Sequence, residues 1–290
     1  MEFFQHLSSG IVLGCIYTLF SLGLTLIYGI LGLVNFAHGE LYMLGAFLAL
    51  FAVATIGMNY FFGMIFAVVM MAIIGMVIER LCFRPLRGMH DTSVIVSTIG
   101  LSVLLQNLAI YVFGADPQRL TTDLTEVMVR FFGLAFSLQR ILIVVVTVML
   151  ILLLNYFSKN TKTGKAMRAC SQDLTAAKVV GININRITLI TCMVGSALAA
   201  IGGGLVAPLY LVSPVMGIKV VVKAFAVVII GGLGNVPGAI LGGFLVGISE
   251  SIAAGMISSH MRDGVAFGIL ILVLLFKPEG IFTKRIQEKV

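Results

Sequence analysis

The sequence predicts an all-α membrane protein, a polytopic bundle of about eight or nine transmembrane helices, and three observations support this fold class. Of the 290 residues, 60% are hydrophobic and 11% are charged, whereas a soluble domain carries about 25% charged residues to coat its surface. The stretch 11–32 has no charged residue and is long enough to cross a hydrocarbon core about 30 Å thick. The short alternating segments typical of outer-membrane barrels are absent. A single transmembrane domain, 1–290, is therefore expected.

Hydrophobic segments follow one another along the chain, and each is a candidate membrane span. In order they are 8–30, 40–57, 61–79, 92–113, 140–157, 187–207, 220–234, 238–256 and 264–276. Between 220 and 256 the apolar run is interrupted by Gly231–Gly238, whose glycines and proline disfavour a continuous straight helix. A re-entrant hairpin in that region would lower the number of crossings from nine to eight.

The basic residues predict the orientation of these spans. Lys and Arg gather in three segments, 79–91, 158–186 and the tail from 277 onward, whereas acidic and basic residues balance in 114–140. Because basic loops stay in the cytoplasm, we expect the three basic segments inside. The 114–139 loop, which is long enough for a surface helix, is then periplasmic. Nine crossings place the N-terminus in the periplasm and the C-terminus in the cytoplasm of a bacterial inner membrane.

The residues offer no catalytic or cofactor-binding constellation. A phosphate-binding loop reads G-x-x-x-x-G-K-[ST], and Gly164-Lys165 lacks both the earlier glycine and the following hydroxyl residue. The four histidines and four cysteines are scattered, so neither a metal site nor a disulfide framework is indicated. We expect no catalytic residue, no metal and no cofactor. The net charge of +7 follows from the topology, so binding of nucleic acid is not expected.

The most informative loop is 158–186, far longer than the other predicted cytoplasmic connections. After a glycine start, its alanines predict short helices with one small, apolar face, ended by a glycine. The candidate contact residues are Gly164, Arg168, Ala169, Asp173, Ala176, Ala177 and Gly181. Such a face can dock into a groove on a partner, and a basic loop can instead rest on anionic lipid headgroups. The residues by themselves leave both interpretations open.

Polar residues within or beside the predicted spans are candidates for a pathway or a gate. They are Asn35, His38, Glu40, Gln106, Asn107, Asn235 and Glu250. Ionisable groups at membrane depth are costly, so they tend to face a cavity or a partner. For His38 and Glu40 the alternatives are a structural role, satisfying the broken backbone around Gly39, and a role in gating or substrate contact.

The other polar candidates have local explanations. Gln106 and Asn107 lie within one predicted span, where interhelical hydrogen bonds are the expected use. Asn235 stands at the glycine-rich break and is expected to cap a helix end. For Glu250, near the end of a span, reaching the interface close to Arg262 is the alternative to a place in the pathway.

Several strings resemble the permease family of branched-chain amino-acid ABC importers, most closely its LivH type, and they occur in order over essentially the whole chain. They are Asn35-Phe36-Ala37-His38-Gly39-Glu40, Gly231-Gly232-Leu233-Gly234-Asn235-Val236-Pro237-Gly238-Ala239, Lys277-Pro278-Glu279-Gly280-Ile281-Phe282, and Cys170-Ser171-Gln172-Asp173 with Gly181-Ile182-Asn183. Ala176-Ala177-x-x-x-Gly181 also looks like the E-A-A-x-x-x-G coupling loop of ABC importer permeases. Two departures are Thr175 in place of the glutamate and the missing leucine-proline ending.

The resemblance implies a passive membrane path that is driven by other subunits. Two ABC ATPase subunits would close against the coupling loop, a second homologous permease would complete a heterodimer, and a periplasmic substrate-binding protein would deliver leucine, isoleucine or valine. Sister families move urea or short amides, which remains an alternative. A stand-alone secondary transporter is a further alternative, but it would need several ionisable groups deep in its helices, and the chain offers only His38, Glu40 and Glu250.

Overall fold

The computed structural model describes residues 2–131, 134–258, 261–278 and 280–282. Within these residues the chain forms helices almost throughout, and its one sheet there is the antiparallel pair β1 (Met128–Phe131) and β2 (Leu134–Ser137). The long helices are α1 (Glu2–Leu31), α2 (His38–Leu50), α3 (Tyr60–Ile78), α5 (Asp91–Phe113), α7 (Leu138–Asn160), α10 (Ile184–Val206), α11 (Met216–Gly231), α12 (Val236–Met256) and α13 (Met261–Phe276). The all-α prediction is confirmed.

Short elements complete the chain. α2 and α3 each run on into a π-helical turn, η1 (Phe51–Thr55) and η2 (Glu79–Phe83). The connections hold α4 (Arg84–Leu86), α6 (Asp123–Glu126), α8 (Lys162–Gln172) and α9 (Leu174–Val179). The 114–139 segment, which is long enough for a surface helix, holds the four-residue α6 and the β1–β2 hairpin.

Seven helical segments in the described residues have the length and hydropathy of a membrane crossing. The other two long helices, α11 and α13, have 16 residues each, about 24 Å at 1.5 Å per residue. α11 ends at Gly231 and α12 begins at Val236, so the glycine-rich string separates two helices as predicted. The chain is a multi-pass membrane protein whose nine predicted segments each fall on a helix.

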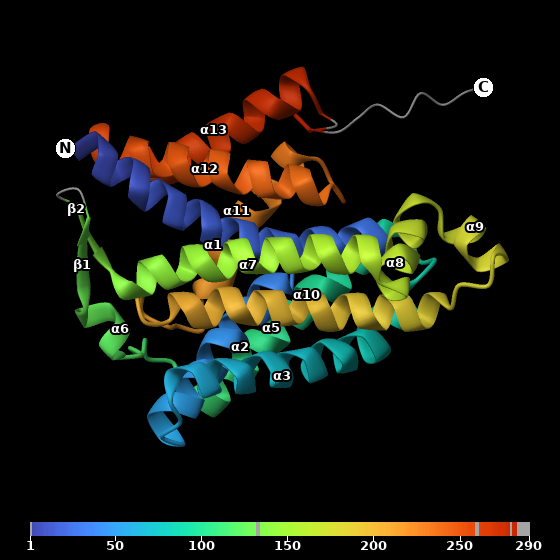
Figure 1. The fold of residues 1–290 in the computed structure, drawn as a ribbon. Coiled ribbons are helices and arrows are strands. Elements are labelled where there is room, and N and C mark those ends of the chain that lie inside the picture. The colour runs from blue at the N-terminus through green and yellow to red at the C-terminus, as the bar shows by residue number, and fades with distance from the viewer. Residues whose placement is uncertain (1, 132–133, 259–260, 279, 283–290) are drawn as a thin grey trace.

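The helices run side by side between two ends of the bundle (Figure 1). One end carries the N-terminus, α6 and the hairpin, and there Gln118 pairs with Val212. The other end carries α8 and α9. Two further basic segments lie at this second end: Arg87 hydrogen-bonds Asn185 at the start of α10, and the backbone of Ile281 donates to Ile230. The part of the basic tail beyond 282 lies outside the described residues.

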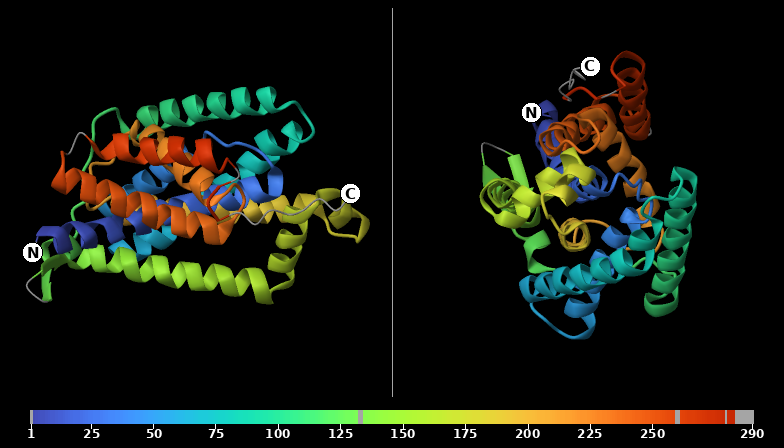
Figure 2. Two further views of the ribbon diagram at one scale, coloured as in Figure 1. Left: turned by 90° about the horizontal axis from the view of Figure 1, so that it is seen from above. Right: turned by 90° about the vertical axis from the view of Figure 1, so that its right-hand side faces the viewer.

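α1 and α10 form the centre of the bundle. Viewed along the helices in Figure 2, they lie inside, with α5 and α7 on opposite sides and α13 at the edge. Most residues in the apolar parts of α1 and α10 are buried, whereas fewer than a third are buried in those of α3, α5 and α7. α1 packs tightly on α12 because glycines of α1 lie at the contact between the two helices. A Cβ on Gly10 of α1 would stand 2.8 Å from the Cα of Ile248 in α12. Small residues of this kind let transmembrane helices approach closely.

Candidate functional site

The long basic loop folds into two short helices joined by one residue. The Thr161 side chain accepts a hydrogen bond from the Gly164 backbone (2.9 Å) and so caps α8. Asp173 ends α8 and caps α9, accepting from the backbones of Thr175 (2.7 Å) and Ala176 (3.0 Å). Side-chain oxygens at this position satisfy backbone donors that a helix start leaves free. The local sequence thus sets where each helix begins.

α8 is attached to the bundle along one face. Met167, Cys170 and Ala177 form an apolar cluster with Ile30 of α1 and Ile187 of α10. At the corner between α7 and α8, a Cβ on Gly164 would stand 2.6 Å from the Ser158 Cα, so only glycine allows this approach. α8 is therefore continuous with the packing of α1, α7 and α10.

α9 presents a different surface. The side chains of Val179 and Val180 are 83% and 75% exposed, and Leu174 is also exposed. Of the alanines expected to form a docking face, Ala176 is exposed and Ala169 half-buried, whereas Ala177 is 3% exposed because it packs inward. The exposed apolar face of this loop therefore belongs chiefly to the valines at the end of α9, which the alanine pattern did not point to.

The end of the loop has the predicted glycine geometry. Gly181 has a φ of +85°, a conformation that costs other residues about 1–2 kcal/mol. The Asn183 side chain then accepts from the Arg186 backbone (3.1 Å) and caps α10. The chain thus returns to the bundle at Asn183, three residues after the exposed Val180.

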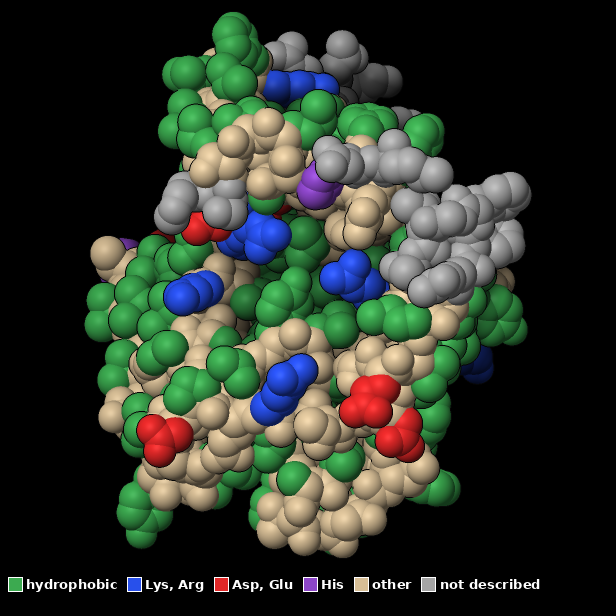
Figure 3. Space-filling view, turned by 90° about the vertical axis from the view of Figure 1, so that its left-hand side faces the viewer, with side chains coloured by type: hydrophobic (Ala, Val, Ile, Leu, Met, Phe, Trp, Pro, Cys, Tyr) green, Lys and Arg blue, Asp and Glu red, His purple; other side chains and the backbone are tan. Residues whose placement is uncertain are grey.

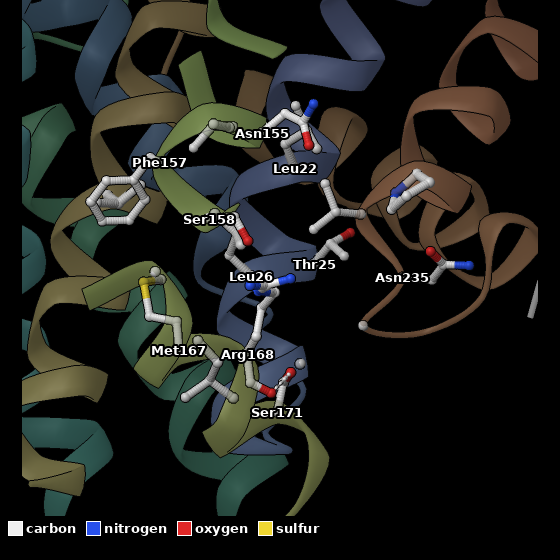
Figure 4. A pocket seen from close by; sticks show the side chains of 18 of the residues that line it. Leu22, Thr25, Leu26, Asn155, Phe157, Ser158, Met167, Arg168, Ser171 and Asn235 are labelled. Carbon is white, nitrogen blue, oxygen red and sulfur yellow. Dashed lines mark hydrogen bonds between the residues drawn. The ribbon is translucent and has the colours of Figure 1, made fainter. Parts of the chain in front are cut away.

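A cavity of about 500 Å³ lies beneath α8. Figure 4 shows Arg168 and Ser171 reaching into it from α8, opposite Leu22, Thr25 and Leu26 of α1. α7 contributes a third wall, and the 234–240 segment at the start of α12 contributes the fourth. Asn235 lies on this fourth wall, where its side chain accepts from the Gly238 backbone (3.2 Å), and so it caps α12 as predicted.

A buried ion pair that the sequence analysis missed lies at the same end. Glu79 in η2 is fully buried and pairs with Arg87, which also bonds Thr188 and donates to the Asn185 side chain (2.7 Å). This network ties the end of α3 to the first turns of α10. The signal was present in the sequence, because Glu79 is an acidic residue at the start of the basic segment 79–91, directly before Arg80.

The 35–40 string forms a buried corner between α1 and α2. The Ala37 backbone donates to the Asn35 side chain (3.0 Å), and His38 donates through Nε2 to the Phe20 carbonyl oxygen (3.2 Å). Glu40 accepts from the Ser102 hydroxyl of α5 (3.1 Å), while its Oε2 has no hydrogen-bond partner among the described residues. The side chains of Asn35 and His38 therefore stabilise the irregular backbone between α1 and α2. One carboxylate oxygen of Glu40 has no hydrogen-bond partner among the described residues.

The interhelical hydrogen bond expected of Asn107 is not what the structure has. Asn107 is exposed on α5 and donates to the Val103 carbonyl oxygen of its own helix (2.8 Å), and Gln106 beside it is half-buried. The prediction is wrong for Asn107 because α5 packs on the bundle mainly through its other face, against α2.

Glu250 is fully buried and paired within the bundle. Lys223 of α11 lies 3.0 Å from Glu250 and 2.8 Å from Asp263 at the start of α13, and the Tyr17 hydroxyl donates to Glu250 (2.7 Å). A charge at this depth is stable only when it is paired and hydrogen-bonded. Lys223 therefore joins four helices, and sequence reasoning missed it because its partners lie far away along the chain.

Together these features define a class of protein. They describe a multi-pass α-helical membrane protein with tightly packed central helices, buried ion pairs and a two-helix loop projecting from one end. Among the described residues no group of His, Cys, Asp and Glu is placed to hold a metal ion. The architecture is that of a polytopic membrane protein such as a transport permease.

The chain belongs to the family described as branched-chain amino acid transport system / permease component, whose model matches residues 6–274. It is 38% identical to the high-affinity branched-chain amino acid transport system permease protein BraD of Pseudomonas aeruginosa, covering 100% of this chain and 98% of that protein. The permease protein LivH of Escherichia coli K12 is 34% identical over the same shares. The resemblance inferred from the motifs is confirmed.

A more distant relative is a second permease protein of Escherichia coli K12. LivM, the high-affinity branched-chain amino acid transport system permease protein, is 26% identical over 92% of this chain and 67% of its own length. No solved structure matches the chain.

Proposed function

We propose that this chain is a membrane permease subunit of an ABC importer that moves leucine, isoleucine and valine into the cell. ATP binding and hydrolysis take place on two partner ATPases, and the permease contributes the path and a mechanical contact. The substrate class comes from the names of the relatives. Sequence similarity to LivM supports a second, related permease as the partner in a heterodimer.

The observation that carries this proposal is the projecting α9 at the basic end of the bundle. Val179 and Val180 offer an exposed apolar contact on a polar, basic loop, and apolar knobs of this kind suit a groove on a partner. α8 behind it is packed on α1, α7 and α10. A displacement of α9 is therefore transmitted through α8 to the central helices. An ATPase contact requires such a mechanical connection.

The opposite end suits a transient protein partner. Figure 3 looks onto this end and shows basic and acidic side chains scattered among hydrophobic ones. We infer that this end is periplasmic, that the N-terminus lies there, and that a substrate-binding protein docks on it. Complementary charges at a rim favour rapid association more than tight binding, as delivery and release require.

Reconstitution tests the proposal. In vesicles that hold this chain with its ATPases, its sister permease and its binding protein, leucine is expected to increase ATP hydrolysis and to be accumulated. Urea and acetamide serve as competitors for the alternative substrate class. Accumulation of urea rather than leucine would overturn the substrate assignment. Uptake by this polypeptide alone, driven by a proton or sodium gradient, would overturn the ABC assignment.

A further inference from the structure

The cavity beneath α8 has aliphatic walls and a cationic mouth. Its deeper part is lined by Leu22, Leu26, Ile151, Leu154 and Ile240. Its polar residues lie nearer the basic end of the bundle, where α7 ends and α8 begins: Asn155, Ser158, Lys159, Arg168, Ser171 and Asn235. The order of these residues along α1 and α7 places the apolar part toward the membrane interior and the cations toward its surface.

The charges that line the cavity indicate which class of ligand can bind there. Arg168 and Lys159 line the cavity, and no Asp or Glu does so; among the described residues neither cation makes a salt bridge. A free amino acid would bring an ammonium group as well as a carboxylate, and the lining offers the ammonium no carboxylate to pair with. A ligand that carries a negative phosphate and an apolar chain matches both parts of the cavity.

A buried hydroxyl on the wall points the same way. Thr25 is fully buried, lines the cavity, and its Oγ1 has no hydrogen-bond partner among the described residues. Figure 4 shows it on the α1 wall, between the apolar part and the Arg168 side. Buried polar atoms are nearly always satisfied in proteins. An ester carbonyl between a phosphate and an acyl chain is an acceptor at that depth.

The side of the cavity between α7 and the start of α12 is the expected entry for an acyl chain. α7 and α12 both pack on α1 but hardly on each other, and each contributes a wall of the cavity. Leu152 and Leu153 lie outside the lining, between its α7 residues Ile151 and Leu154, and their apolar side chains are exposed.

We infer that this cavity binds one anionic phospholipid of the inner leaflet. Its phosphate lies at Arg168 and Lys159, and one acyl chain lies along Leu22, Leu26 and Leu154. The lipid fills the space beneath α8 and so supports the helix that carries α9. Lipid binding requires neither ATPases nor substrate, so this inference stands or falls separately from the proposed transport function.

Tryptophan fluorescence tests the inference directly, because the chain has no tryptophan. Phe157 lines the cavity, and Phe157→Trp places a single emitter there with a conservative change. The full-length chain is placed in phosphatidylcholine vesicles that contain a small fraction of lipid brominated on its acyl chains. Brominated phosphatidylglycerol is expected to quench about fivefold more effectively than brominated phosphatidylcholine, since one basic contact near the surface is worth about that factor.

Two charge variants in the Phe157→Trp background separate a site from general attraction. Arg168→Gln is expected to lower quenching by phosphatidylglycerol toward that by phosphatidylcholine. Lys165→Gln, on the exposed side of α8 and outside the lining, is expected to leave it unchanged. Equal quenching by both lipids, an equal effect of the two charge variants, or loss of quenching on adding leucine would each overturn the inference.

A measurement on the unsubstituted chain covers the case in which Phe157→Trp fails to insert. Native mass spectrometry of the purified full-length chain is expected to retain one phosphatidylglycerol, and Arg168→Gln is expected to lose it. Absence of the bound lipid from the unsubstituted chain, or its retention in Arg168→Gln, would contradict the site.

Discussion

α8 and α9 follow one another in the same loop, yet they meet the rest of the molecule in opposite ways. α8 buries Met167 and Cys170 against α1 and α10 and closes a cavity with Arg168. α9 buries Ala177 and turns Val179 and Val180 outward. The difference teaches that one basic loop combines a helix attached to the bundle with a helix that exposes an apolar face. The two interpretations that the sequence left open, lipid contact and docking, are therefore proposed for neighbouring helices.

The strongest way to break this comparison is to detach α9 from α8. Ala177→Arg would place a charge in the apolar cluster, at a cost of several kcal/mol, so we expect a large fall in the thermal midpoint of the purified protein and loss of leucine-stimulated ATP hydrolysis. Ala176→Arg, on the exposed side of the same turn, should shift stability by no more than about 0.5 kcal/mol. Similar midpoints for the two variants would show that α9 is not anchored through Ala177.

The outward face of α9 can be tested without touching its anchor. Val179→Asp with Val180→Asp is expected to weaken ATPase binding about thirtyfold, the effect of losing an interface contact worth about 2 kcal/mol, and to leave insertion and thermal midpoint unchanged. Co-purification of the ATPases and leucine uptake measure this. Lys165→Asp on α8 is the matched control, and an equal loss in that variant would show that the contact is not confined to α9.

Thiol labelling sharpens the contrast between the helices. Cys170 on α8 is buried, and burial raises the pKa of its thiol. The thiolate is the reactive form, so a higher pKa leaves less of it at neutral pH. In a background with Cys82→Ser, a cysteine introduced by Val179→Cys is expected to react with a water-soluble maleimide at least about tenfold faster than Cys170. Equal labelling rates would mean that α8 separates from the bundle in solution.

The smallest expected effect concerns the turn that follows α9. Gly181→Ala would put a side chain at a φ of +85°, costing about 1 kcal/mol, and should lower the thermal midpoint slightly while α8 is unaffected. Gly100→Ala is the control, since a Cβ there meets no atom within 4 Å and its helix has ordinary dihedral angles. A midpoint as high in Gly181→Ala as in the parent would show that the turn tolerates a side chain.

Much of the fold was predictable because its signals are local. Long apolar runs predicted the helices, and the string from Gly231 to Gly238 predicted the break between α11 and α12. Asn235 and Gly181 were read correctly because a capping amide and a left-handed glycine act on backbone groups within a few residues. The hairpin between 128 and 137 was missed, because four-residue strands leave little periodicity to detect.

The partners of the buried charges were not predictable in the same way. Glu250 pairs with Lys223, 27 residues away, and with Tyr17, 233 residues away. The inward side of α9 was missed too, because a run of alanines does not say which of them the rest of the chain will cover. Asn107 was assigned a partner on another helix, but its own helix turns it outward.

The sequence by itself determined that the chain is a membrane bundle, which stretches form its long helices, and which loop is long and basic. Lipid solvation demands long apolar helices with internally bonded backbones, and composition and spacing reveal such helices. Only the tertiary structure decided which side of the loop is exposed, which charges neutralise each other, and where a cavity remains. These follow from the distances between helices that are remote in sequence, and packing of whole surfaces sets those distances.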